Sequence, residues 1–325
     1  MLKKSTALFL CMLGAIILIS STLSAKGLPV PDRGFISTEP ATTWEEGIIS
    51  GNDTIGANVF ARPLDETIVF THERLFMPMG SPHMPPADQA LRLFEIRKLI
   101  DRGLYKQATE LAFELSEQDG FRYPDPFVPA FDMNIKMESE GDVKDYMRSV
   151  NFETGETIVY WADDRGEFER RLFVSRADGI AVMRITGSKP GSISCEMNLG
   201  PRDPSWKLGE GAYRHLKRSV KERSNERFRE CVKDITSTAD ESSLMFSNGF
   251  TKAYPGSIQS LYGLANVTTK NGTKKSVGNT LKIDGADSVL VLIDVKPVYN
   301  PRLASFDKMK NALSMKSTDY SQLLK

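Results

Sequence analysis

Two short groups of polar residues stand at the ends of apolar, strand-like runs in the first quarter of the chain. Asn52 and Asp53 follow Gly51 in the run WEEGIISGNDTIGANVF, and His72 and Glu73 close the run ETIVFTHE. A glycine-bounded turn lets the backbone approach a ligand, and loop residues commonly carry binding functions. The sequence therefore makes these four residues candidate ligand-binding groups. The structural alternatives are an Asx turn in a tight hairpin and a hydrogen-bonded pair at a strand end.

The other chemically active groups predict no metal, cofactor or nucleic-acid site. His83 lies in the proline-rich run MPMGSPHMPP without a second ligand nearby. The spacing of Cys195 and Cys231 fits either a disulfide or two thiols, one buried and one exposed. The 42 acidic and 42 basic residues balance, so the charge does not favour nucleic acid as a partner. The mixed-charge run RHLKRSVKERSNERFRECVKD is expected to form a solvated hairpin or a helical excursion.

The amino-terminal segment has the three-part pattern of a secretory signal peptide. Lys3 and Lys4 precede the apolar run from Ala7 to Ile19, and small residues follow as far as Ala25. An apolar run of about 13 residues is shorter than the ~20 that a membrane-spanning helix needs. We therefore expect residues 1–25 to be a signal peptide, the mature chain to be secreted or periplasmic, and no stable membrane anchor to remain after its removal.

The elements that must position the candidate residues are mostly strands. Short alternating or β-branched runs are separated by Gly, Asp, Asn or Pro, which is typical of successive antiparallel hairpins. The runs predicted as strands are WEEGIISGNDTIGANVF (two strands), ETIVFTHE, PAFDMNIKM, MRSVNF, ETIVYWAD, EFERRLFVS, GIAVMRITG, SISCEMNLG, SLMFSNGF, IQSLYGLANVTT, TLKIDG and SVLVLIDVKP. So many strands over roughly 250 residues predict a mainly β fold, a large antiparallel β-sandwich of the supersandwich type.

Two helical regions are expected beside the strands. Apolar residues recur at helical spacing from Ala87 onward, Gly103 interrupts them, and a second amphipathic run continues from Tyr105 to about Gln118. This pattern predicts a helical hairpin inserted between strands. The final stretch, from Ala304 to Lys325, is predicted to be a linker helix. Its apolar residues are expected to need a partner surface outside this chain; they are Phe306, Met309, Leu313, Leu323 and Leu324.

Several of these runs together resemble the amino-terminal domain of glycoside hydrolase family 95, the α-L-fucosidase type. The family's opening is similar to WEEGIISGNDTIGANVF followed by LDETIVFTHERLF, and LFEIRKLIDRGLYKQATELAF is similar to its helical insert. The run from DYMRSVNFETGETIVYWAD to GIAVMRITGSKPGSIS resembles its hairpin series, and IDGADSVLVLIDVKPVYNP resembles its closing strand. The chain departs from the family where it has Asp53 after Gly51-Asn52, and His72 before Glu73.

The resemblance implies a domain plan and a chemistry. After the signal peptide at 1–25 and a polar leader at 26–43, it implies a family 95 amino-terminal β-sandwich domain at 44–301 and the start of an interdomain helical linker at 302–325. Family members are inverting hydrolases, which need two groups about 6.5 to 9.5 Å apart across the scissile bond. In the family these groups belong to an (α/α)6 barrel that follows the β domain, so no residue of this chain is assigned as catalytic. The missing barrel is the expected protein partner.

The resemblance also implies carbohydrate as the substrate class. The expected function is a domain of an exported enzyme that hydrolyses terminal α-L-fucosyl or α-L-galactosyl residues, inactive as an isolated chain. Asn52, Asp53, His72 and Glu73 are then the candidate sugar-binding residues. Trp44, Trp161 and Trp206 could stack on a sugar ring, although the alternative for each is a place in the core. The competing hypothesis is a free-standing, non-catalytic glycan-binding module.

Overall fold

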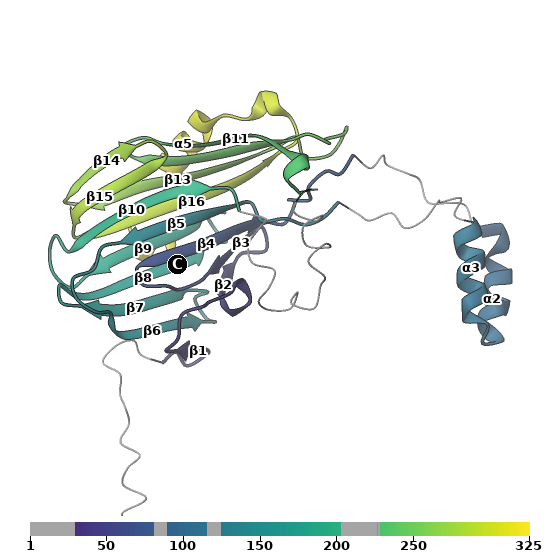
Figure 1. The fold of residues 1–325 in the computed structure, drawn as a ribbon, viewed down its shortest axis with the longest axis horizontal. Helices are drawn as coiled ribbons and strands as arrows, with labels where there is room; N and C mark the ends of the chain where they lie inside the picture. The colour runs from purple at the N-terminus through teal and green to yellow at the C-terminus, as the bar shows by residue number, and fades with distance from the viewer. Residues whose placement is uncertain (1–29, 81–89, 116–124, 203–225, 227) are drawn as a thin grey trace, which may run out of the picture.

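A computed structural model of the chain describes residues 30–80, 90–115, 125–202, 226 and 228–325. The body is a sandwich of two antiparallel sheets, as predicted (Figure 1). The predicted signal peptide, His83, Trp206 and most of the mixed-charge run lie outside the described residues.

The larger sheet has nine strands in the order β1-β6-β7-β8-β9-β16-β13-β12-β11. Its strands are β1 (Gly34–Ser37), β6 (Lys144–Asn151), β7 (Thr157–Asp163), β8 (Gly166–Val174), β9 (Ala181–Gly187), β11 (Val232–Ala239), β12 (Ser243–Phe250), β13 (Ser260–Lys270) and β16 (Ser288–Val298). Every pairing between neighbouring strands is antiparallel. The strand β1 lies within the predicted leader and pairs with β6 at the edge of this sheet.

The smaller sheet has seven strands in the order β14-β15-β10-β5-β4-β3-β2. Its strands are β2 (Ile48–Gly51), β3 (Ile55–Val59), β4 (Asp65–His72), β5 (Phe131–Met137), β10 (Ile193–Gly200), β14 (Thr273–Val277) and β15 (Thr280–Ala286). Each predicted strand is present. In the predicted series of consecutive hairpins, β5 lies in this sheet and precedes β6 to β9, which follow one another as hairpins in the nine-stranded sheet. The next strand, β10, crosses to this sheet and pairs with β5 and β15.

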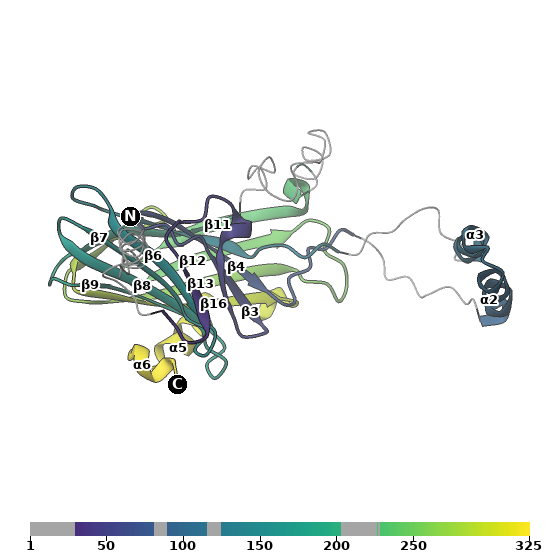
Figure 2. The same ribbon diagram turned by 90° about the horizontal axis from the view of Figure 1, so that it is seen from below.

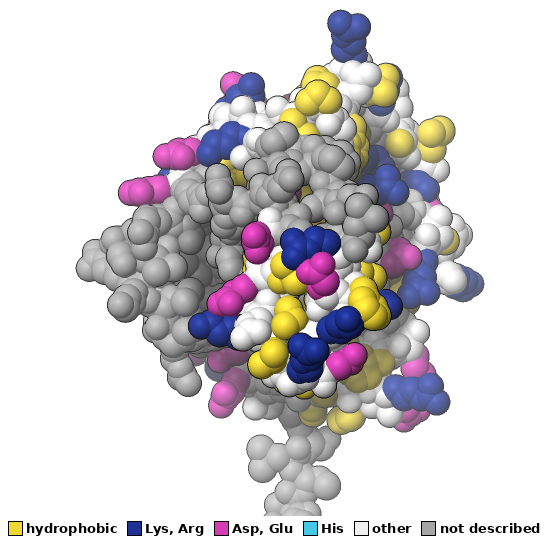
Figure 3. Space-filling model, turned by 90° about the vertical axis from the view of Figure 1, so that its right-hand side faces the viewer, with side chains coloured by type: hydrophobic (Ala, Val, Ile, Leu, Met, Phe, Trp, Pro, Cys, Tyr) yellow, Lys and Arg dark blue, Asp and Glu magenta, His cyan; other side chains and the backbone are white. Residues whose placement is uncertain are grey.

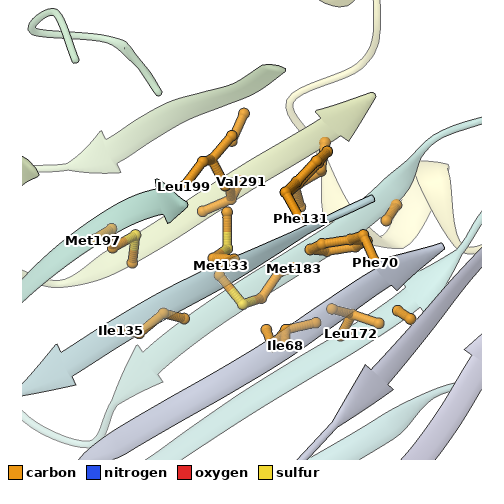
Figure 4. Packing of buried hydrophobic residues seen from close by; sticks show 14 of the residues in the cluster. Ile68, Phe70, Phe131, Met133, Ile135, Leu172, Met183, Met197, Leu199 and Val291 are labelled. Atoms are coloured by element: carbon orange, nitrogen blue, oxygen red, sulfur yellow. The ribbon is translucent and has the colours of Figure 1, made fainter. Parts of the chain in front are cut away.

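The core fills the space between the two sheets. Strands such as β3 and β10 alternate buried and less buried residues, so every second side chain points inward. Figure 4 shows such inward-facing residues: Ile68, Phe70, Phe131, Met133, Ile135, Leu172, Met183, Met197, Leu199 and Val291. Phe131 lies between Phe70 and Phe246, with ring centroids 5.4 and 5.7 Å apart. Cys195 and Cys231 are both buried, free thiols, so the structure shows neither of the two alternatives that their spacing left open.

The predicted helical hairpin is present between β4 and β5. It consists of a 3-10 turn at Ala90–Arg92, α2 (Leu93–Asp101) and α3 (Tyr105–Leu115). Gly103, with φ +72°, connects the helices, because glycine adopts the left-handed conformation without steric cost. Large apolar side chains such as Phe94 and Tyr105 remain exposed. Figure 3 views the molecule from the hairpin side, where hydrophobic and charged side chains are interspersed.

The carboxyl-terminal tail packs on the sandwich itself. It contains a 3-10 turn at Pro301–Leu303, α5 (Phe306–Ser314) and α6 (Tyr320–Leu323). Figure 2 shows both helices beside the nine-stranded sheet, and four of their residues are buried against its outer face: Met309, Leu313, Tyr320 and Leu323, which contact Phe173, Ile180, Val182, Leu264, Leu290 and Leu292. The expectation that the tail needs a surface outside the chain was therefore wrong, because even-numbered positions of β16 make the outer face of this sheet apolar as well.

In the part of the chain that the structure describes, none of the helices combines the length and apolar character needed to cross a membrane.

The small 3-10 turn at Trp44–Glu46 precedes β2.

Candidate functional site

The turn between β2 and β3 holds Asn52 through hydrogen bonds on both sides of its amide. Asn52 Oδ1 accepts hydrogen bonds from the backbone amides of Thr54 (3.1 Å) and Ile55 (2.8 Å), and Nδ2 donates to the carbonyl oxygen of Ser175 (2.8 Å). The side chain is buried. This is the Asx turn of the structural alternative, since the amide shapes the hairpin and ties it to the end of β8.

Asp53 occupies the exposed tip of the same turn. Its φ is +79°, a left-handed conformation that Asp and Asn adopt more readily than other non-glycine residues. Asp53 Oδ1 accepts a hydrogen bond of 3.2 Å from Thr54 Oγ1. The carboxylate therefore stands at the surface, where it can accept hydrogen bonds from a ligand.

The end of β4 brings the other two predicted residues beside this turn. His72 pairs with Ile55 across β3 and β4, and the Glu73 amide donates a hydrogen bond of 2.8 Å to the Thr54 carbonyl oxygen. The predicted residues thus lie together at one end of the seven-stranded sheet, because adjacent antiparallel strands bring a turn beside the end of the neighbouring strand.

His72 and Glu73 differ in exposure. His72 is buried, and its Nδ1 accepts a hydrogen bond of 3.1 Å from the Arg74 amide. Burial lowers the pKa of His72, so the neutral imidazole is favoured, as its acceptor role requires. Glu73 is exposed and its Oε1 lies 3.1 Å from Arg74 Nε. At this end of the sheet, Asp53 and Glu73 therefore present their carboxylates to solvent, whereas Asn52 and His72 support the backbone.

The two tryptophans in the described residues have different environments. Trp161 is fully buried, stacks on Phe168 at a centroid distance of 5.4 Å, and carries the Arg170 guanidinium 5.5 Å from its ring centroid. Trp161 is thus a core residue. Trp44 is half-buried, and its carbonyl oxygen accepts a hydrogen bond of 2.9 Å from Asn58 Nδ2.

A pocket that sequence reasoning missed lies between the end of β16, the β8–β9 turn and α5. Its volume is about 570 Å³. Its polar lining includes Asp178, Asp294, Lys296, Lys308 and Lys316, and its apolar lining includes Ile180, Tyr262, Tyr299, Met309 and Leu313. A half-open space of this size with a mostly apolar wall and a few polar groups has the composition of a small-molecule site.

Asp294 is the most unusual group in this pocket. It is 4% exposed, and its Oδ1 accepts no hydrogen bond from the described residues. Lys296 Nζ lies 3.5 Å from that oxygen. Burial raises the pKa of Asp294, because loss of water disfavours the charged form more than the nearby lysine favours it. The sequence signal was present: Asp294 is the single charged residue in the otherwise apolar run SVLVLIDV.

Asp178 and Lys316 close the pocket on one side. Lys316 Nζ lies 3.0 Å from Asp178 Oδ1, so this ion pair joins the carboxyl-terminal tail to the β8–β9 turn. Both side chains are partly buried. The pocket wall therefore holds two carboxylates that each have a lysine partner: Asp178 with Lys316 at 3.0 Å and Asp294 with Lys296 at 3.5 Å.

Another buried carboxylate with an oxygen that lacks a hydrogen bond from the described residues is that of Asp132, on β5 of the seven-stranded sheet. Asp132 Oδ2 accepts a hydrogen bond of 2.9 Å from Arg202 Nη1, while its Oδ1 has no hydrogen-bond partner among the described residues. Burial raises the pKa of Asp132 to about 6 in spite of Arg202. Among the described residues, no three His, Cys, Asp or Glu side chains come together as a metal site would require.

The chain is similar in sequence to a curated plant protein. Alpha-L-fucosidase 2 from Arabidopsis thaliana is 26% identical over 164 residues, which cover 49% of this chain and 19% of that protein. The chain thus matches about a fifth of the length of this relative. The solved structure described as "Putative kojibiose phosphorylase from human microbiome" covers 91% of this chain and 38% of its own, with 7% identity and a TM-score of 0.44.

The family comparison covers most of the sandwich. The model described as "Glycosyl hydrolase family 65, N-terminal domain" matches residues 35–302. That span includes all but the first residue of the sheet strands, from β1 to β16. It ends before α5 and α6. The chain therefore belongs to the family of glycosyl hydrolase family 65 N-terminal domains.

Proposed function

We propose that this chain is the amino-terminal β domain of an exported glycoside hydrolase of the family 95 type, which hydrolyses terminal α-L-fucosyl or related residues. The observation that carries this proposal is the 26% identity over 164 residues to Alpha-L-fucosidase 2. Membership of a glycosyl hydrolase N-terminal domain family supports the same class of enzyme.

In this proposal the domain supports catalysis without supplying the catalytic pair. The carboxylates of an inverting pair must face one another across the scissile bond. The exposed carboxylates at the Asn52–Thr54 turn and the end of β4 are Asp53 and Glu73, and Glu73 is engaged by Arg74. We assign these two residues to the rim of a sugar site that is completed by a helical barrel. Asn52 and His72 hold that rim in place.

The activity test compares the 325-residue chain with the complete product of its gene. Both proteins are incubated with aryl α-L-fucoside, α-L-galactoside and α-D-glucoside substrates, and aryl alcohol release is measured. The proposal expects turnover of the fucoside or the galactoside by the complete product and none by the 325-residue chain. Turnover by this chain alone, or a complete product active on the α-D-glucoside alone, would overturn it.

The rim assignment has its own test in the complete product. Asp53→Asn and Glu73→Gln should each raise KM several-fold with little change in kcat, because these groups would bind the sugar without taking part in bond cleavage. Asp65→Asn, on an exposed residue at the start of β4, is the matched control. Unchanged KM in both rim variants would remove these residues from the site.

Export is tested by the amino terminus of the mature protein. The proposal expects secreted or periplasmic protein that begins near Ala25 or Lys26. Recovery of the protein in the cytoplasm with Met1 or Leu2 at its amino terminus would contradict export.

A further inference from the structure

A continuous series of hydrogen bonds joins the carboxyl-terminal tail to the turn at Asn52. It begins at Lys316, between α5 and α6, whose Nζ lies 3.0 Å from Asp178 Oδ1 in the β8–β9 turn. The two side chains are 30% and 25% exposed, so water and salt screen this ion pair only in part. The tail therefore holds the Asp178 carboxylate in one position.

Asp178 shapes the backbone of its own turn through Ser175. The Asp178 amide donates a hydrogen bond of 3.1 Å to Ser175 Oγ, and Ser175 Oγ donates one of 3.3 Å to Asp178 Oδ2. The Gly179 amide donates to the Ser175 carbonyl oxygen at 3.1 Å. Hydrogen bonds from short polar side chains to nearby backbone fix the conformation of a turn. The position of the Ser175 carbonyl oxygen thus depends on Asp178.

The same carbonyl oxygen connects the two sheets. Asn52 Nδ2 donates to the Ser175 carbonyl oxygen at 2.8 Å, and Ser175 and Asn52 are only 5% and 4% exposed. Loss of this buried hydrogen bond would leave both groups unsatisfied, which is costly. The preceding Val174 amide is held separately by Ser50 Oγ at 3.1 Å, so the end of β8 is fixed. A shift of the turn beyond it must therefore be followed by the Asn52 amide.

The Asn52 side chain holds the backbone that carries Asp53. Asn52 Oδ1 accepts hydrogen bonds from the amides of Thr54 and Ile55. The Thr54 carbonyl oxygen accepts a hydrogen bond of 2.8 Å from the Glu73 amide. A change at Asn52 therefore reaches both exposed carboxylates of the proposed sugar rim.

We propose that Asp178 and Lys316 are positioning residues for this rim. Through Ser175 and Asn52 they hold the turn that presents Asp53 to the sugar. The effect on the sugar rests on the proposed function, whereas the coupling between tail and turn is a property of this chain. Coupling of this kind is demonstrated by changing one end of the network and measuring the other.

The first measurement is amide hydrogen exchange of the 325-residue chain, followed by NMR. Lys316→Met should speed the exchange of the Thr54 and Ile55 amides about threefold or more, because the turn opens more often without the ion pair. Asp178→Ala should have the same effect. Lys316→Arg keeps a positive partner for Asp178 and should restore the exchange of the unmodified chain.

Lys310→Met is the matched control. Lys310 Nζ, on α5, lies 2.7 Å from Asp240 Oδ2. This variant removes a lysine–aspartate contact of the same tail without changing the series of hydrogen bonds to Asn52, so exchange in the turn should stay as it is. Unchanged exchange in Lys316→Met would overturn the proposal. An equal increase in both lysine variants would overturn it too, since it would mean that any loosening of the tail has this effect.

The second measurement is the KM of the complete gene product for an aryl α-L-fucoside. Lys316→Met should raise KM about twofold or more with little change in kcat, as expected for a group that affects binding alone. Lys316→Arg should restore KM, and Lys310→Met should not change it. Unchanged KM in Lys316→Met, where Asp53→Asn raises it, would overturn the proposal. If Asp53→Asn also leaves KM unchanged, the rim assignment fails, and hydrogen exchange alone decides whether the tail positions the turn.

Discussion

Tyr320 Oη donates a hydrogen bond of 2.9 Å to Glu156 Oε1, and this contact fastens the last helix of the chain to the nine-stranded sheet. Glu156 is buried and also lies 3.4 Å from Arg171 Nη1. On the other side, the Arg184 guanidinium lies 4.2 Å from the Tyr320 ring centroid. Burial raises the pKa of Tyr320 strongly, so the phenol keeps its proton and remains a donor.

Tyr320→Phe is expected to destabilise the chain by about 1–2 kcal/mol, because it leaves a buried carboxylate with one hydrogen bond fewer. Chemical denaturation measures the difference in the free energy of unfolding. Tyr299→Phe, at an exposed residue of the same type, is the control and should change stability little. Equal stability of the two variants would show that the Tyr320 contact does not hold the tail.

The core leaves no room for a side chain at Gly263 on β13. A Cβ atom there would lie 2.3 Å from Phe131 Cε1, and that ring is itself confined by Phe70 and Phe246. Gly263→Ala should cost about 1–3 kcal/mol from overpacking. Gly200→Ala is the matched control, since the nearest atom to its Cβ is 3.9 Å away. The account of this core would be wrong if thermal unfolding gave both variants the same midpoint.

The buried ion pair of Glu66 and Arg170 joins the two sheets across the core. Both side chains are almost fully buried, and Arg170 Nη2 also donates to the Arg62 carbonyl oxygen at 2.6 Å. Glu66→Gln should destabilise the chain by about 3–5 kcal/mol, because it leaves the guanidinium charge uncompensated.

A double variant gives the decisive comparison for this pair. Glu66→Leu combined with Arg170→Met should lose clearly less stability than the sum of the two single changes, since both charges leave the core together. Urea unfolding of the four proteins measures the coupling. Additive losses would mean that the two side chains do not stabilise one another.

Asp132 makes the stability of the fold depend on pH. Burial raises its pKa from 3.8 to about 6 in the folded chain, so the folded state binds this proton more tightly than the unfolded state. Its contribution to stability is therefore present below about pH 4 and is lost as the pH rises through about 6. Asp132→Asn should gain stability relative to the unmodified chain between pH 4 and 7.

The measurement for Asp132 is the free energy of unfolding of both proteins at several pH values, with Asp65→Asn as an exposed control. A constant difference between Asp132→Asn and the unmodified chain across this range would contradict the raised pKa.

The strands that the sequence missed all lie at the edges of the sheets. The runs ETIVFTHE and SVLVLIDVKP became β4 and β16, which have neighbours on both sides. The missed strands β1, β11 and β14 are all edge strands. Edge strands carry polar and charged residues that discourage further pairing. Their mostly exposed residues, such as those of TKKSV in β14, lack the apolar alternation on which prediction depends.

Only the part of the candidate site that is formed by neighbouring segments of the chain could be predicted from the sequence. The turn containing Asn52 and the end of β4 are local features, and antiparallel pairing brings them together. The pocket at Asp294 is assembled from β16, the β8–β9 turn and α5, which are far apart in sequence. No spacing rule connects Asp178, Asp294 and Lys316. The packing of the tail could not be predicted either, because the second apolar face of β16 was not distinguished from its core face.

The central proposal is that this domain belongs to an inverting hydrolase of terminal α-L-fucosyl or related residues. The most direct measurement is proton NMR of the sugar that the complete gene product first releases from an aryl α-L-fucoside. The account predicts β-L-fucose as the first anomer, because inversion places the attacking water opposite the leaving group. Release of α-L-fucose first, or the absence of fucose release under conditions where another glycoside is cleaved, would contradict it.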